Sequence, residues 1–179
     1  MKATGIVRRV DSLGRVVIPK EIRHTLRIQE GAPLEIYTDR DGSVTFRKYS
    51  PLGDLQDLAA ALTGAIRAQT GCACAVTDRD TVLAVAGGPR KALEQQPCSR
   101  ALDHLMEQRS LCRFPPEAER VPLCDAEPAQ VLSLMVPVTG QGDLLGCVAL
   151  LRDPRSPVPP DAAELVVRTA ADFLGRQAE

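Results

Sequence analysis

The chain has 179 residues, of which 44% are hydrophobic and 25% charged, as in a globular protein with one large or two small domains. It contains no apolar run of about 18 residues, and its first residues, Met-Lys-Ala-Thr-Gly, lack an apolar signal region, so we expect a cytoplasmic protein without a membrane span. The net charge of −1 conceals an asymmetry, because residues 1–50 carry ten basic and six acidic side chains while 51–179 carry twelve and seventeen.

The pattern of residues 1–50 predicts a ββαββ unit. We expect strands at 6–10 and 16–18, joined by a turn at 11–14 in which Gly14 can take a positive φ. Pro19 favours the start of a short helix with Ile22 and Leu26 on its apolar side, ending at Glu30 and Gly31. Two more strands, with alternating apolar residues around 34–36 and 44–46, flank a hairpin turn at 39–42.

Basic side chains gather on two elements of this unit. Arg8, Arg9 and Arg15 flank the first turn, and Lys20, Arg23 and Arg27 share one face of the helix. With Lys2, they are opposed by only Asp11 and Glu21 over residues 1–27. Guanidinium groups suit bidentate contacts with phosphate or guanine. A solvated basic surface without a ligand is the alternative, but concentration on a turn and an adjacent helix favours nucleic acid.

Residues 4–23, TGIVRRVDSLGRVVIPKEIR, followed by LEIY and TDRDG at 34–42, resemble the AbrB-type swapped-hairpin DNA-binding domain. The resemblance implies that two chains interleave their hairpins into a dimeric barrel. It also implies DNA contacts by Arg8, Arg15 and Arg23, with Arg9 at a basic position. His24 stands where the family often has a second arginine, and histidine titrates near neutral pH.

Two properties of the residues themselves agree with a dimer on duplex DNA. A ββαββ unit of about 50 residues buries little apolar surface alone, which favours a homodimer. Aromatic residues make up only 3% of the chain and Trp is absent, whereas proteins that hold single strands stack bases on aromatic side chains.

Residues 51–179 predict an α+β domain. Pro51 ends the strand pattern, and Ser50 can cap a helix at 52–69 that packs on its own domain or pairs with a partner's copy. Asp161 and Glu164 form an approximate capping box for the final helix. The other expected elements are strands at 73–77, 82–86, 131–138 and 144–151, a helix at 98–108, a loop at 114–128 with a short edge strand near 120–124, and a stiff connector at 157–160.

Three segments of this domain, TDRDTVLAVAG, PVTGQGDLLGCVALL and ADFLGRQ, resemble the GAF-type domain of the stage V sporulation protein T regulators. The middle, 89–130, departs from that pattern. The resemblance implies an antiparallel sheet flanked by helices that either binds a small-molecule effector or joins chains into a tetramer. No glycine-rich phosphate loop or HExxH motif identifies a ligand, so we expect no cofactor.

The cysteines and histidines give little support to catalysis. No CxxC pair exists, disulfides are rare in the cytoplasm, and a Cys–His pair built on His104 lacks any supporting motif. We therefore expect no enzyme and no metal, with redox-sensitive thiols or a metal site on Cys98, Cys112 and Cys124 as alternatives. The six cysteines are Cys72, Cys74, Cys98, Cys112, Cys124 and Cys147.

Together these features predict a homo-oligomeric transcription regulator that binds duplex DNA, by resemblance at sporulation or stationary-phase genes. The expected DNA-contacting residues are Arg8, Arg9, Arg15, Arg23 and His24. One alternative is an antitoxin-like protein with the same DNA-binding unit and a partner-binding second domain. The other is a cysteine-based redox or metal sensor.

Overall fold

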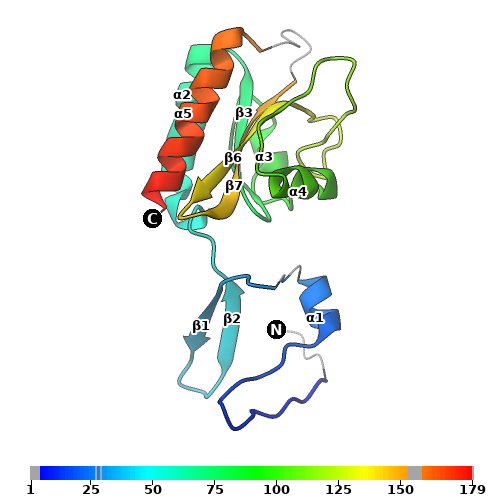
Figure 1. Cartoon of the computed structure of the whole chain (residues 1–179), viewed down its shortest axis with the longest axis vertical. Coiled ribbons are helices and arrows are strands. Elements are labelled where there is room, and N and C mark those ends of the chain that lie inside the picture. Colours follow the sequence, from blue (N-terminus) through cyan, green and yellow to red (C-terminus); the bar gives the residue numbers. More distant parts are fainter. Residues whose placement is uncertain (1–4, 27, 29, 153–158, 179) are drawn as a thin grey trace. The chain divides into compact units, whose positions relative to one another are not determined.

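The structure, a computed structural model, describes residues 5–26, 28, 30–152 and 159–178. The chain divides into an N-terminal unit, Met1–Tyr49, and a C-terminal unit, Ser50–Glu179 (Figure 1). Ser50 belongs with the C-terminal unit, one residue before the predicted boundary, because its hydroxyl donates to Asp78 Oδ2 over 2.8 Å. Lys2, Arg27 and the first two residues of the predicted connector lie outside the described residues.

The N-terminal unit contains a short helix, α1 (Lys20–Thr25), and a hairpin of β1 (Leu34–Thr38) and β2 (Val44–Lys48). Ile36 pairs with Phe46, so the alternation that predicted the hairpin is confirmed. Its turn closes through the Gly42 N–H, which donates to the Asp39 carbonyl at 3.1 Å while Gly42 has a φ of +84°. That left-handed conformation explains the glycine.

The segments 6–10 and 16–18, predicted as strands, are not assigned as strands in the single chain. A strand is defined by ladder hydrogen bonds, and the described residues of one chain supply no partner for these segments. Helix α1 also ends earlier than predicted, at Thr25, whose hydroxyl donates to the Glu21 carbonyl.

Apolar side chains of the N-terminal unit face solvent. Among its described residues only Pro19 is buried, so the unit has no hydrophobic core in the single chain. The exposed large apolar residues are Ile6, Val7, Val10, Leu13, Val16, Val17, Leu26, Ile36, Tyr37, Val44, Phe46 and Tyr49.

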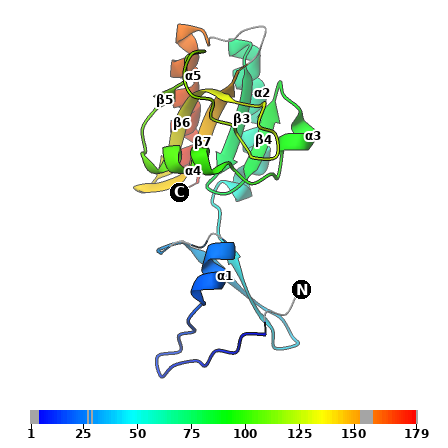
Figure 2. The ribbon, with the colours of Figure 1, turned by 90° about the vertical axis from the view of Figure 1, so that its right-hand side faces the viewer.

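The C-terminal unit is built on a five-stranded antiparallel sheet in the order β4-β3-β7-β6-β5, which confirms the predicted α+β class. Helices α2 and α5 cover one face, and α3 and α4 lie on the other (Figures 1 and 2). The strands are β3 (Ala73–Asp78), β4 (Val82–Ala86), β5 (Cys112–Arg113), β6 (Leu132–Gly140) and β7 (Asp143–Leu151). The helices are α2 (Gln56–Thr70), α3 (Arg90–Leu93), α4 (Arg100–Glu107) and α5 (Asp161–Gln177).

Each face of the sheet has its own core. Ile66 of α2 and Leu174 of α5 pack on one face, and Leu102 and Met106 of α4 pack on the other, all at most 2% exposed. Helix α2 therefore packs on its own domain, which is one of the two arrangements that its sequence pattern allowed. None of the helices in the described ranges is long and apolar enough to cross a membrane.

Helix α2 begins later than predicted, at Gln56, because a 3-10 turn, Gly53–Leu55, precedes it. The Ser50 hydroxyl accepts a hydrogen bond from the Gly53 N–H of that turn at 3.0 Å. The end of the helix is as predicted. Gly71 closes the helix with a φ of +70°, and its N–H donates to the Arg67 carbonyl. A residue without a Cβ adopts this conformation at low cost.

Two further local predictions, both in the C-terminal unit, were wrong. The edge strand is β5, which pairs with Leu134 and Met135 of β6, whereas 120–124 forms only isolated bridges. The capping box at α5 does not form, because Pro160 occupies the N-cap position and has neither a backbone N–H nor a side-chain acceptor. Glu164 binds Arg113, 51 residues earlier in the chain, and Arg168.

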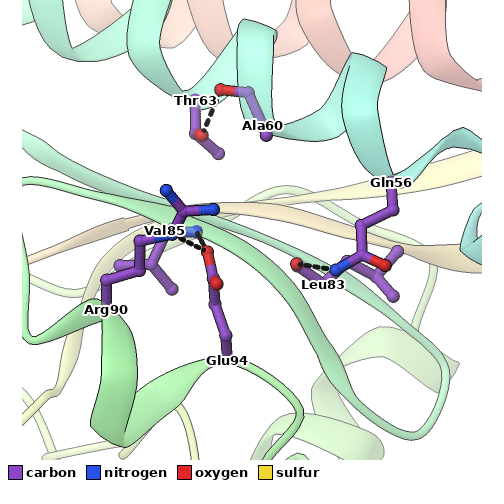
Figure 3. Close-up of polar contacts among 7 residues, drawn as sticks. All are labelled: Gln56, Ala60, Thr63, Leu83, Val85, Arg90 and Glu94. Carbon is purple, nitrogen blue, oxygen red and sulfur yellow. Dashed lines mark hydrogen bonds and ion pairs between the residues drawn. The ribbon is translucent and has the colours of Figure 1, made fainter.

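Side chains close the outer edge of β4 (Figure 3). The Glu94 carboxylate accepts from the Val85 N–H at 3.2 Å and from Arg90 Nε at 2.7 Å. Gln56 of α2 donates to the Leu83 carbonyl at 3.4 Å. These contacts occupy backbone groups that an edge strand otherwise offers to another strand.

Helix α5 packs against the β6–β7 hairpin at Gly175. A substitution there can be compared with the same substitution at Gly64, where the Cβ position is open. A Cβ at buried Gly175 would lie 2.1 Å from the Thr139 carbonyl oxygen, so Gly175→Ala should destabilise the C-terminal unit by about 1–3 kcal/mol. Gly64, in the exposed face of α2, has open space at its Cβ position, so Gly64→Ala should stabilise by up to ~1 kcal/mol. Urea unfolding of both variants measures the difference, and a Gly175→Ala chain as stable as the parent would contradict this packing.

Candidate nucleic-acid interface

The turn that carries the first arginine cluster is built around Asp11. Its Oδ1 accepts hydrogen bonds from the backbone N–H groups of Leu13 and Arg15, both at 2.9 Å. The Asp11 N–H donates to the Arg15 carbonyl and the Gly14 N–H to the Asp11 carbonyl, each at 3.0 Å. Gly14 has a φ of +76°, as the predicted turn requires.

The same aspartate orients Arg15. Arg15 Nε donates to Asp11 Oδ2 at 2.8 Å, although the arginine side chain is 71% exposed. The hydrogen bond from the Arg15 backbone, and then that from its side chain, lower the pKa of Asp11, so the carboxylate stays ionised at neutral pH. Because the ion pair uses Nε, the two terminal nitrogens of Arg15 can approach a ligand.

Helix α1 presents the second group of predicted contacts. Arg23 and His24 lie in its last turn and are exposed, as is Lys20 at its start. The Arg23 N–H donates to the Pro19 carbonyl at 2.9 Å, which begins the helix. The C-terminal end of a helix favours cations, so this position suits the guanidinium of Arg23.

The five predicted DNA-contacting residues therefore all lie on the surface of the N-terminal unit. Arg8 and Arg9 are exposed in the segment before the turn, and Arg15 follows it. Sequence analysis missed the orienting role of Asp11. An aspartate at the start of a tight turn, followed four residues later by an arginine, is the sequence pattern that could have predicted it. It also omitted Arg47, whose guanidinium lies 4.9 Å from the Tyr37 ring centre.

The thiols show no arrangement suited to chemistry. Cys112 is half-buried and the other five are buried, and burial raises the pKa of Cys147 to about 12 and the pKa values of Cys74, Cys98 and Cys124. A protonated thiol is a poor nucleophile and metal ligand. In the described ranges no group of three or more His, Cys, Asp or Glu side chains could hold a metal ion, Cys98, Cys112 and Cys124 included.

Comparison with known proteins decides the family. A family model described as "Stage V sporulation protein T C-terminal, transcription factor" matches residues 54–179. The chain belongs to the stage V sporulation protein T family. Stage V sporulation protein T of Bacillus subtilis (strain 168) is 43% identical over 180 residues, covering 100% of this chain and 99% of that protein. The family predicted from the sequence is confirmed.

The two units also have separate relatives. A bacterial antitoxin model, "Antidote-toxin recognition MazE", matches 7–54, and the transition state regulatory protein AbrB of Bacillus subtilis is 61% identical over 51 residues, 28% of this chain and 52% of that protein. The GAF domain/HD domain protein from Geobacter sulfurreducens matches with a TM-score of 0.51 and 17% identity, covering 71% of this chain and 93% of that chain. That likeness shows the GAF fold alone.

Replacement of Arg15 tests the interface. Arg15→Ala should weaken binding to a duplex target by about 1–3 kcal/mol if the side chain contacts a base. The fold should persist, because the exposed ion pair with Asp11 contributes little to stability. Arg176→Ala, which removes an equally exposed ion-paired arginine from α5, is the control. Equal affinities of the parent and Arg15→Ala in a mobility-shift assay would remove Arg15 from the interface.

Proposed function

We propose that this protein is a transcription regulator that binds duplex DNA through its N-terminal unit. The observation that carries the proposal is the pairing of a preformed arginine turn with an adjacent basic helix, in a chain of a transcription-factor family. Arg8, Arg9, Arg15, Arg23 and His24 are its contacts. Arginine–phosphate contacts provide affinity, and base edges and groove shape provide selectivity.

The DNA-binding form is a dimer with interleaved hairpins. Twelve large apolar side chains of the N-terminal unit are exposed, and a unit of this size without a core does not fold stably alone. Segments 6–10 and 16–18 contain β-branched residues but find no ladder partner among the residues that the structure describes. A second copy supplies both the missing strand partners and the missing core.

The C-terminal unit joins DNA-binding units into a tetramer and senses a small-molecule effector. Leu165 and Phe173, its only exposed large hydrophobic residues in the described ranges, both lie on α5 and offer an apolar contact to another chain. Tethered DNA-binding units engage at a high effective concentration, which raises avidity without new contacts. In keeping with its transcription-factor family, we assign the unit no catalytic role.

The regulated genes are those of sporulation or the stationary phase, and the protein acts in the cytoplasm, where the chromosome lies. An antitoxin-like role is the second candidate, favoured by the match of 7–54 to the MazE antitoxin model. In that role the C-terminal unit would bind a partner protein of another sequence. Sedimentation of the purified chain with and without cell extract, followed by mass spectrometry of the complex, separates self-association from such a partner.

Salt dependence tests the DNA-binding proposal. With four arginines per chain, log affinity for a duplex should fall linearly with log salt, with a slope of roughly −0.9 per phosphate contacted. Fluorescence anisotropy of the full chain on a labelled duplex, from low to physiological salt, measures the slope. Binding that does not change with salt would show that the arginine surface is not the DNA site.

Hydrogen exchange tests the interleaved dimer. The amides of 6–10 and 16–18 should exchange slowly in the full chain at micromolar concentration, because strands from a second copy hold their hydrogens. The amides of the Asp39–Gly42 turn, which is closed within one chain, provide an internal reference. Exchange of 6–10 and 16–18 at the rate of an unfolded peptide would rule out the interleaved barrel.

A further inference from the structure

A pocket of about 300 Å³ lies in the C-terminal unit, between the segment after β5, strand β6 and the first turn of α5. Figure 2 shows β5 beside α5, and the Arg113–Glu164 ion pair joins them. A volume of this size suits a small ligand of a dozen or so heavy atoms. The sheet face under α4, in contrast, is filled by Leu102, Met106 and Met135, each at most 1% exposed.

The pocket wall after β5 is preformed. The Phe114 N–H donates to the Ser133 carbonyl at 2.9 Å, which fixes the start of the segment to β6. Arg152, just after β7, donates through its terminal nitrogens to the carbonyls of Pro115 at 2.7 Å and Pro116 at 3.3 Å. The wall therefore needs little ordering when a ligand binds, and preorganisation of this kind favours affinity.

The pocket lining combines apolar walls with one arginine and three carboxylates, two of which have no ion-pair partner in the described part of the chain. Arg113, its only described cation, donates from Nε to Glu164 Oε2 at 2.7 Å, and Arg168 Nε binds Glu164 Oε1 at 3.0 Å. Glu117 and Asp161 form no ion pair with any other described residue. The apolar lining consists of Phe114, Pro115, Pro116, Leu134, Pro159 and Pro160.

We propose that this pocket binds a small organic cation, an amine with an aromatic or branched apolar body, and that its occupancy changes the affinity of the chain for DNA. The apolar rings hold the body of the ligand, and Glu117 and Asp161 accept hydrogen bonds from its ammonium group. The second half of this inference rests on the proposed function as a DNA-binding regulator. The first half stands on the pocket alone.

Calorimetric titration of the full chain with 2-phenylethylamine tests the ligand class. The neutral 2-phenylethanol and the anion phenylacetate have bodies of the same shape and serve as matched ligands. We expect the amine to bind at least about tenfold more tightly than either, since only the amine gains charge-assisted hydrogen bonds. No heat from the amine at millimolar concentration, or equal binding of phenylacetate, would overturn the assignment.

A double variant, Glu117→Gln with Asp161→Asn, tests the site. Both side chains are exposed, so the fold should persist, and amine affinity should fall about tenfold or more. Asp172→Asn, on α5 outside the pocket, is the matched control and should bind like the parent. An unchanged affinity of the double variant would show that the amine binds elsewhere.

The effector role has its own measurement. Duplex affinity of the full chain, measured with and without saturating 2-phenylethylamine, should differ severalfold in the parent and not in the double variant. Amine binding with unchanged duplex affinity would overturn the effector role. Absence of duplex binding in both states would instead refute the proposed DNA-binding function, while the calorimetry still decides the pocket.

Discussion

The N-terminal unit depends on one constraint: it carries more apolar surface than one chain can bury. Val7, Val17 and Ile36 are each at least 60% exposed, and Pro19 is the only described residue of the unit that is buried. Burial of apolar area is the main stabilising contribution to folding. In the proposed interleaved dimer, folding, assembly and DNA binding of this unit are one coupled process, and the population of the DNA-binding form depends on protein concentration.

The C-terminal unit, in contrast, builds its hydrophobic cores within one chain. Both sheet faces have filled cores, and the outer edge of β4 is occupied by Glu94 and Gln56. A sheet closed at this edge does not recruit a strand there from another copy. In the proposed tetramer, contacts between copies of this unit involve helix α5, where Leu165 and Phe173 are exposed.

Local sequence signals predicted most of the C-terminal elements and the hairpin of the N-terminal unit. The alternation around Ile36 and Phe46, and the glycine at position 71, depend only on near neighbours. Other features have long-range causes. Glu164 binds Arg113, and no periodicity reveals a partner 51 residues away. Segment 6–10 has no strand partner among the described residues, and in the proposed dimer that partner belongs to another chain. The arginines of the candidate interface could be predicted from composition and resemblance. The pocket could not, because its wall is held by a hydrogen bond from Arg152 to the Pro115 carbonyl that forms only in the folded chain.

Asp11, which shapes the arginine turn, also influences the DNA atoms to which Arg15 can donate hydrogen bonds. The Asp11 carboxylate lies 2.8 Å from Arg15 Nε and carries a full negative charge. A phosphate approaching the same guanidinium meets repulsion from that carboxylate, whereas the O6 and N7 atoms of guanine carry only partial charges and meet far less. In the proposed interface, Asp11 therefore weakens contacts of Arg15 with phosphate more than contacts with a base edge. Such a bias would shorten the time that the proposed regulator spends on the wrong sequences.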